Sequence, residues 1–502
     1  SGGISLMAKY PGFVGPSYTS QSRIAAYDRT VNLYAERIES GTGTAQYVLY
    51  PAPGYASFFE FGLSGGNGRG IFASADRGMF YVFGNTFYQN ASTNRGTVSN
   101  TTDNPVAILF NGDAGDQLLL NADNATYCYN LSTNVFTDVS GTTQCTSIGF
   151  LNGFFLRLDP NLSEVSFSAL FDGTTWDALD VFQRSDAADR WQRLIVNHNE
   201  IYLFGDETTS VYAHTTDPDT PFQPIQSAFI PMGIYAPFSA CVVDGQIMWV
   251  GRGSGGFGIV YRMNGYTPQR VSTFAVEYAI SQIDPAVVAL ADSRTYQDRG
   301  HTFYELTFPA MEVTNFITAV VTDYPGSTWV YDATEGLWHE RGQRNEQGDF
   351  VCVDTRGQSL FFGQQFSVSR SSGLVYTQSI ETLTANGDPI VRLRRAPHIF
   401  DEHKGVIIDR FELFLETGLG LGGVPSTTVG YDPQIAMRFS NNGGQTWSNT
   451  RMASAGRIGE FNTRAEWNGL GYGRDRIIEV SVSSPVPWRL IDAFVDVRVG
   501  NS

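Results

Sequence analysis

The sequence predicts an all-β protein: a β-propeller of six or seven blades, with an extended N-terminal arm before it and an antiparallel β-sandwich or sheet after it. Three observations predict this class. A hairpin-like unit recurs along most of the chain, glycine is abundant at 53 of 502 residues with 13% aromatic residues, and the C-terminal part alternates apolar and polar residues. Glycine suits tight turns and aromatic side chains suit strands. We expect the arm at 1–62, the propeller at 63–377 and the C-terminal β domain at 378–502.

The arm has one or two plausible strands, followed by Pro51 and Pro53. Two prolines this close together resist both a helix and the interior of a sheet. A segment of this kind has little core of its own. We therefore expect residues 1–62 to pack on a neighbouring subunit or on another protein of an assembly.

The repeated unit is a short apolar strand, a polar turn and a second apolar strand. A single hairpin cannot bury its apolar face, whereas a ring of hairpins can. Successive turns lie roughly 37 to 57 residues apart, close to the period of four-stranded propeller blades. The copies begin at Ile71, Ile108, Ser147, Leu194, Ala240, Thr295 and Phe350, and their turns are expected near Arg77, Ala114, Asn152, His198, Asp244, Arg299 and Arg356.

Two of these turns have a specific chemical signature. Asn152-Gly153 and Asp244-Gly245 suit the positive φ that tight hairpins require, so we predict a hairpin turn at each pair. Helix is expected to be scarce, and the segment AADRWQRL at 187–194 is predicted to form one or two helical turns.

The C-terminal domain is expected to begin near a turn at Asn386-Gly387 and to contain the strands RFELFLETG, IAMRFS, RIIEVSVSS and LIDAFVDVRVG. The segment SNNGGQTW, Ser440 to Trp447, resembles the Asp-box hairpin of sialidase-type propellers, with Asn442 at the usual Asp position. Such a turn ties backbone amides to a polar side chain and is not catalytic.

The formal net charge is −17, so phosphate groups are repelled and a grip on nucleic acid is not expected. The one compact basic run is Arg392, Arg394 and Arg395 in VRLRRAPHIF. It is either a solvated strand face or an anchor for an acidic neighbouring surface. Alternation places Arg392 and Arg394 on the same face of a strand. We predict that the three arginines contact another subunit or another protein.

Sequence motifs for catalysis or cofactor binding are weak. GRGSGG at Gly251–Gly256 matches a dinucleotide-binding pattern, but a strand pattern follows it where a helix would be needed. The histidines lack metal-ligand spacing, and no nucleophile elbow is present. The four cysteines form no CxxC pair and are interpreted as reduced, a Cys128–Cys145 disulfide being the alternative. We predict no catalytic residue, cofactor, metal site or membrane segment.

Several segments, in order, are similar to the packaged-DNA stabilisation proteins, the tail-hub or nozzle subunits of short-tailed bacteriophages. They are DRTVNLYAE, LYPAPG, IYLFGDETTSVYAHTTDPDTPFQPI, APFSACVVDGQIMWVG, GIVYRMNGYTPQRVSTFAVEYAI, YQDRGHTFYELTFP, TWVYDATEGLWHERG and LRRAPHIF. The resemblance spans roughly residues 28–400, and it is the order and spacing of the segments that make it specific. The Ser/Thr/Asn-rich stretch from Asn90 to Thr146 departs from the family pattern.

The resemblance implies a non-enzymatic virion protein that is assembled in the host cytoplasm. It would form a six-fold ring below the portal and adaptor, extend the DNA channel, retain packaged DNA until ejection, and carry fibres or spikes and a tail needle or plug. DNA would pass through without specific binding. The alternative is a β-propeller glycosidase of sialidase type or a carbohydrate-binding propeller.

Overall fold

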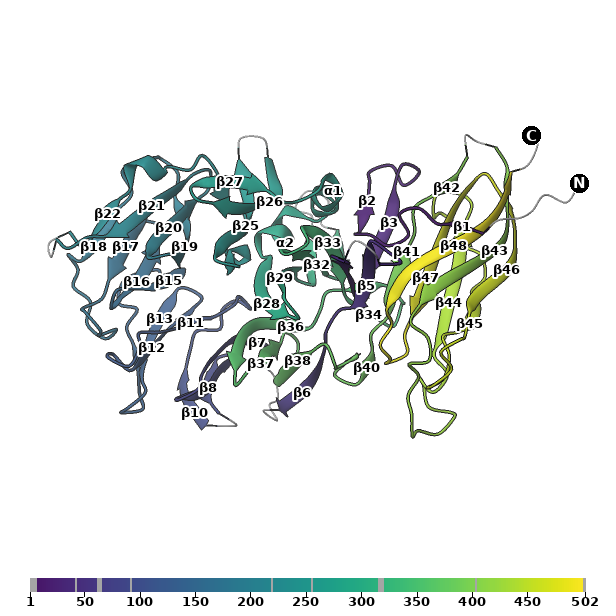
Figure 1. Cartoon of the computed structure of the whole chain (residues 1–502). Helices are drawn as coiled ribbons and strands as arrows, with labels where there is room; N and C mark the ends of the chain where they lie inside the picture. Colours follow the sequence, from purple (N-terminus) through teal and green to yellow (C-terminus); the bar gives the residue numbers. More distant parts are fainter. Residues whose placement is uncertain are drawn as a thin grey trace, which may run out of the picture.

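The computed structural model describes residues 7–40, 43–60, 66–90, 93–217, 220–253, 256–314, 320–401 and 404–499. In this part of the chain seven β-sheet blades form a propeller, and a β-sandwich lies beside it (Figure 1). The sandwich contains the last strands of the chain together with strands from its beginning. Within the same residues, no helix is both long enough and apolar enough to cross a membrane.

Blades 1 to 4 are each a meander of four consecutive antiparallel strands. Blade 1 contains β7 (Gly68–Ser74), β8 (Gly78–Phe83), β9 (Thr86–Gln89) and β10 (Thr93–Thr97), and blade 2 contains β11 (Ala107–Phe110), β12 (Gln117–Ala122), β13 (Ala125–Asn130) and β14 (Val135–Asp138). Blade 3 contains β15 (Ser147–Leu151), β16 (Phe154–Asp159), β17 (Glu164–Phe167) and β18 (Val181–Gln183). Blade 4 contains β19 (Trp191–Asn197), β20 (Glu200–Gly205), β21 (Thr209–His214) and β22 (Phe222–Pro224).

Blades 5 and 6 carry additions to this plan. In blade 5 the first strand is divided into β23 (Gly233–Ile234) and β24 (Cys241–Val243), which both pair with β25 (Gln246–Gly253), followed by β26 (Gly256–Asn264) and β27 (Thr267–Arg270). Helices α1 (Phe274–Ser281) and α2 (Pro285–Ala289) follow and pack their apolar side chains between blades 5 and 6. Blade 6 is β28 (Asp292–Asp298), β29 (His301–Phe308), β32 (Ser327–Asp332) and β33 (Leu337–Arg341), with small hairpins β30–β31 (Met311–Thr314, Val321–Tyr324) and β34–β35 (Gln343–Arg344, Phe350–Val351) beside it.

Blade 7 closes the propeller with a strand from the start of the chain. Its first three strands are β36 (Thr355–Phe361), β37 (Gln364–Ser369) and β38 (Leu374–Ser379), and its fourth is β6 (Gly54–Glu60), antiparallel to β38. The short β39 (Thr384–Ala385) and β40 (Asp388–Pro389) extend this sheet beyond β6. Main-chain hydrogen bonds thus join segments more than three hundred residues apart and lock the ring of blades.

The sandwich has two sheets over one apolar core. One sheet contains β4 (Leu33–Arg37), β5 (Tyr47–Pro51), β48 (Leu490–Val499), β43 (Val406–Leu415) and β46 (Ala465–Gly473), with β1 (Ala8–Lys9) on β48. The other contains β41 (Arg392–Arg395), β47 (Asp475–Val482), β44 (Gln434–Ser440) and β45 (Arg451–Ser454), with β42 (Ile399–Phe400) on β47. The second sheet continues through β3 (Tyr27–Val31), which also carries β2 (Tyr18–Thr19), into β33 of blade 6.

The described part of the N-terminal segment is therefore not an extended arm. Leu33 and Leu49 are fully buried in the sandwich core, and β6 belongs to the propeller. The segment finds its apolar and main-chain partners within its own chain. The expectation of an extended arm with little core of its own is therefore wrong for residues 7–40 and 43–60, whereas packing of residues 1–62 on a neighbouring subunit or on another protein of an assembly stays a prediction.

Two local predictions also need correction. AADRWQRL is not helical, because its second half, from Trp191, is strand β19, which pairs with β20 and buries Trp191 and Leu194. The turn expected near Arg356 lies instead at Phe362-Gly363, where both φ values are positive. Arg356 is inside β36, next to a bulge where Gly357 has a φ of 62°.

Candidate functional site

The basic run found in the sequence forms β41, between β3 and β47. Arg392, Arg394 and Arg395 are only 0%, 1% and 4% exposed. A cation this deeply buried is costly unless partners satisfy it. The partners come from distant stretches of the same chain.

Arg394 holds the segment that precedes β2. Its guanidinium donates hydrogen bonds to the carbonyl oxygens of Gly12 at 3.0 Å, Phe13 at 2.5 Å and Pro16 at 3.1 Å, and to Thr30 Oγ1 at 2.8 Å. Burial lowers the pKa of Arg394 to about 10. The side chain therefore stays charged at neutral pH and serves as a multiple donor to a loop with few strand partners.

Arg392 also donates to backbone carbonyl oxygens, but makes fewer hydrogen bonds than Arg394. It donates to the carbonyl oxygens of Leu383 at 3.1 Å and Ser484 at 3.3 Å. Burial lowers the pKa of Arg392 to about 10 as well. It thereby connects the end of the propeller to the loop that follows β47.

Arg395 shares a buried carboxylate with another arginine. Glu479 Oε2 lies 2.6 Å from Arg395 Nη2, and Glu479 Oε1 lies 2.6 Å from Arg438 Nη2. Both guanidinium groups also lie over the ring of Trp447, at 5.0 and 4.7 Å from its centre.

Trp447 closes the turn that resembles an Asp-box. In this turn Asn442 Oδ1 accepts from the amide of Thr446 at 2.9 Å, and Ser440 Oγ accepts from the amide of Gly444 at 2.9 Å. The polar side chains fix the loop, as expected for a folding turn. The turn presents its tryptophan to the arginines of the sheet.

The three arginines thus lie inside one chain and not on a surface that another molecule could reach. Alternation was expected to place Arg392 and Arg394 on one face of the strand, and the three arginines were expected to contact a neighbour. Instead both faces of β41 are covered. Residues 12–16 contact Arg394 on one face, and Glu479 and Trp447 contact Arg395 on the other. The predicted contact with another subunit or protein is corrected to a contact between distant parts of the same chain.

The same sheet carries a second ion pair where it enters the propeller. On β3, Arg29 Nη2 lies 2.5 Å from Glu340 Oε2 of β33, and Arg29 Nε donates to Glu340 Oε1 at 3.0 Å. Ser17 Oγ donates to the same carboxylate at 2.9 Å. Burial raises the pKa of Glu340, but the attraction of Arg29 outweighs it, so the net pKa is lowered.

A third cluster lies within blade 6. Glu305 is 1% exposed, and its two oxygens face Arg294 Nε at 2.5 Å and Arg341 Nη1 at 2.7 Å. Arg341 Nη2 donates to the carbonyl of Pro53 at 2.6 Å, and Arg294 Nη2 donates to Gln378 Oε1 of blade 7 at 2.8 Å. Burial raises the pKa of Glu305, but the two arginines outweigh it and lower it to about 2.

We call these three clusters the buried ionic joint. It ties the propeller, the N-terminal segment and the sandwich together through ion pairs and hydrogen bonds of buried and half-buried side chains. Its members are Arg29, Arg294, Glu305, Glu340, Arg341, Arg392, Arg394, Arg395, Arg438 and Glu479.

The two dipeptides predicted as turns lie where neighbouring strands reverse. Asn152 and Gly153 connect β15 to β16 with φ values of 49° and 90°, and Asp244 and Gly245 connect β24 to β25 with φ values of 49° and 71°. These values belong to the left-handed region, where Gly, Asn and Asp are tolerated best.

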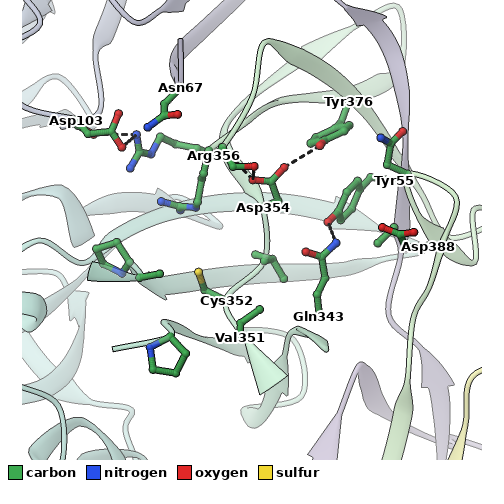
Figure 2. Close-up of a pocket in the computed structure, with 18 residues that line it drawn as sticks. Tyr55, Asn67, Asp103, Gln343, Val351, Cys352, Asp354, Arg356, Tyr376 and Asp388 are labelled. Carbon is green, nitrogen blue, oxygen red and sulfur yellow. Dashed lines mark hydrogen bonds and ion pairs between the residues drawn. The ribbon is translucent and has the colours of Figure 1, made fainter. Parts of the chain in front are cut away.

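A cavity of about 690 Å³ lies between β6, β34, β36 and β40 (Figure 2). Several of its polar groups have protein partners. Asp354 accepts from Tyr376 OH at 2.7 Å, and Gln343 Nε2 donates to Tyr55 OH at 2.5 Å. These hydrogen bonds hold Asp354 and Gln343 in place at the wall of the cavity.

The cavity also contains the thiol of Cys352 (Figure 2). Burial raises the pKa of this thiol, so it stays protonated and weakly nucleophilic at neutral pH. Across the described residues, no group of three or more His, Cys, Asp or Glu side chains is arranged to hold a metal ion. The cysteines in this part of the chain are free, and the Cys128–Cys145 disulfide is absent there.

Sequence reasoning singled out the arginines of β41 but missed the carboxylates of the joint. A local signal existed for one of them. Glu305 stands alone in the apolar stretch TFYELTF, and an isolated charge in a strand that is apolar on both faces indicates a buried pair. Arg29 and Glu340 stand in mixed stretches, where nothing local distinguishes them from solvated charges.

Comparison with known proteins gives two family matches. A family model described as bacteriophage P22 Gp10, beta-propeller, matches residues 21–362, and one described as bacteriophage P22 Gp10, beta-sandwich, matches residues 391–498. The first match ends inside blade 7, and the second begins immediately before β41. No curated protein sequence matches the chain.

Solved structures are similar only at low identity. The N-terminal domain of Nup159 is 12% identical, with a TM-score of 0.38, over 70% of this chain and 99% of that one. The extracellular domain of a one-component system from B. thetaiotaomicron is 10% identical, with a TM-score of 0.37, over 91% and 62%. PorZ of the type-IX secretion system of Porphyromonas gingivalis is 9% identical, with a TM-score of 0.33, over 64% and 37%.

Proposed function

Because the chain belongs to the bacteriophage P22 Gp10 family of packaged-DNA stabilisation proteins, and is thus a structural protein of a phage tail, we propose that its copies form a six-fold ring below the portal and adaptor. The observation that carries the proposal is the match of both family models, propeller and sandwich, in order along this one chain. The ring would extend the DNA channel and anchor fibres or spikes and a needle or plug.

The buried ionic joint supports this role. A tail subunit has to transmit force between its parts without bending when DNA presses on the closed channel. Ion pairs and hydrogen bonds from β3, β33 and β41 connect the propeller to the sandwich inside one continuous sheet. Such a subunit would move as one rigid body in the ring.

The charge of the chain supports passage of DNA without binding. A net charge of −17 opposes contact with phosphate groups over roughly the screening distance of about 8 Å at physiological salt. Retention of packaged DNA would therefore come from completing and plugging the tail. Contacts with the DNA backbone would contribute little.

Two experiments test the proposal. Native mass measurement of the protein bound to its adaptor should give six copies, and particles assembled without the protein should package DNA and then lose it to added nuclease. Salt-sensitive, tight binding of duplex DNA by the purified protein would contradict the passive channel. Stable, infectious particles lacking the protein would contradict the retaining role and make the glycan-binding propeller the better hypothesis.

A further inference from the structure

The first strands of the blades, that of blade 3 excepted, line a pocket at the centre of the propeller, which we call the axial pocket. Neighbouring blades contact one another through these strands, as β36 does with β7 and β28, and β11 does with β7 and β15. The pocket has a volume of about 260 Å³. This is below the roughly 300–1,000 Å³ of pockets for drug-sized ligands, so it suits only a small ligand. Much of its wall is apolar, with side chains from Ile71, Val106, Ile108, Leu109, Phe238 and Ala240.

Three arginines line this pocket, and two of them have counter-ions. Arg69 donates to Asp123 Oδ1 at 2.7 Å and spends its other donors on backbone carbonyls. Arg356 lies 3.4 Å from Asp103 and 3.5 Å from Asp292. Asp292 is also bound by Arg370, which lies outside the pocket wall.

The third arginine, Arg193 of β19, has no counter-ion among the described residues. Its guanidinium lies over the ring of Phe238 at 5.8 Å, and its buried Nε has no hydrogen-bond partner there. Burial lowers the pKa of Arg193 to about 10, so the side chain is still charged at neutral pH. Once the other charges of the pocket are paired off, this one positive charge remains.

A cation without a counter-ion beside an apolar wall destabilises the folded chain, and an anion bound from solution would remove this destabilisation. We propose that the axial pocket binds one small oxyanion, with Arg193 as its charged donor. The class includes phosphate, sulfate and small free carboxylates, which accept charge-assisted hydrogen bonds from a guanidinium.

A second group in the pocket fits this ligand. Gln358 of β36 lines the same space, and its buried Oε1 has no hydrogen-bond partner among the described residues. Rotation of the amide by half a turn would present Nε2 as a donor in place of Oε1. An anion held by both side chains would connect blade 4 to blade 7 across the axis of the propeller.

The test is anion-dependent stability of the full chain at constant ionic strength. The unfolding temperature should rise with the logarithm of phosphate concentration, and equilibrium dialysis with labelled phosphate should give one ion per chain. Arg193→Gln should lose this response and bind phosphate at least tenfold more weakly, while its stability without phosphate is unchanged or higher. Parallel titrations with sulfate and acetate show whether tetrahedral oxyanions or carboxylates bind better.

Arg37→Gln is the matched control, because Arg37 is exposed and its loss removes the same charge from the surface. It should respond to phosphate as the unmodified protein does. Arg193→Lys provides a second variant that keeps the charge but lacks the forked donor, and it should bind phosphate with intermediate affinity. The proposal fails if none of the three anions raises the unfolding temperature, or if Arg193→Gln responds as strongly as Arg37→Gln.

Discussion

The blades of the propeller and the buried ionic joint are built in opposite ways. In blades 1 to 4 every strand pairs with the strand next to it in sequence, through turns such as Asn152-Gly153. In the joint, Arg394 reaches a carbonyl 381 residues away and Arg29 reaches Glu340, 311 residues away. Local pairing lets each hairpin be specified by its own sequence. The joint combines the ion pairs of Glu305 within blade 6 with contacts that form only when both ends of the chain are in place.

This contrast predicts that equivalent changes have larger effects in the joint than in the blades. A blade turn can change its conformation without moving other elements, because one side of it faces solvent. A buried charge in the joint cannot, because its partners come from several elements that would have to move together. Substitutions at the two kinds of position measure this difference.

The largest effect is expected for Glu305→Gln. The neutral amide cannot balance Arg294 and Arg341, which would be left as buried charges beside it. Breaking a buried ion pair in this way costs about 3–5 kcal/mol of unfolding free energy. Denaturant unfolding at neutral pH, followed by tryptophan fluorescence, measures the loss. Glu312→Gln, at an exposed position of β30, is the control and should be nearly neutral; equal stabilities for the two variants would contradict the role of the joint.

The next effect is a loss of stability in acid. The pKa of Glu305 is about 2 in the folded chain, below the ordinary value of 4.5, because Arg294 and Arg341 outweigh the effect of burial. A lowered carboxyl pKa stabilises the fold fully above about pH 4.5, and this contribution disappears as the pH falls towards 2. The loss for this group alone is roughly 3 kcal/mol, at 1.36 kcal/mol per pKa unit. Glu305→Gln should therefore show a shallower decline between pH 4.5 and 2, and an unchanged decline would contradict the assignment.

A smaller but still substantial effect is expected for Gly54→Ala, where the N-terminal segment enters blade 7. A Cβ at this position would overlap the carbonyl oxygens of both Thr382 and Thr384. These are backbone atoms and cannot rotate away, so β6 would have to shift relative to β39. Overpacking of this kind costs about 1–3 kcal/mol. Limited proteolysis should also cut the variant faster within β6, and a variant as resistant as the unmodified chain would show that blade 7 closes without this close approach.

The same contrast explains what could be predicted from the sequence. Each of the seven hairpins was visible because its apolar strands and its turn are contiguous, and six of the seven turns lie where they were expected. The failure at Arg356 has a local cause. The polar stretch around Arg356 was interpreted as a turn, but it lies within β36, where the positive φ of Gly357 serves a bulge.

The joint could not be predicted in the same way. The cluster of Arg392, Arg394 and Arg395 was found, but its environment was not, because carbonyls of residues 12–16 leave no mark in the sequence around β41. Likewise, the segment 27–60 looked like an arm because, apart from the local hairpin of β4 and β5, the partners of its strands lie far away in the sequence, in β33, β38, β41 and β48. Tertiary pairing, which local patterns do not encode, decides these elements.

The smallest effect is expected for Gly153→Ala, the counterpart of Gly54→Ala in a blade turn. Gly153 has a φ of 90°, where an alanine is strained, and a Cβ would lie 2.7 Å from Leu170 Cδ1. Leu170 is exposed and its side chain can rotate away, so the backbone strain of about 1 kcal/mol should dominate. Gly300→Ala is the matched control, because Gly300 has a φ of 87° and a Cβ added there would have no atom within 4 Å. Similar losses for the two turn variants, both below that of Gly54→Ala in denaturant unfolding, would sharpen the comparison between local turns and contacts of distant segments. A loss at Gly153 as large as that at Gly54 would mean that a blade turn is as tightly coupled as the entry of the N-terminal segment into blade 7, and the distinction between local and distant construction would no longer describe how this chain is stabilised.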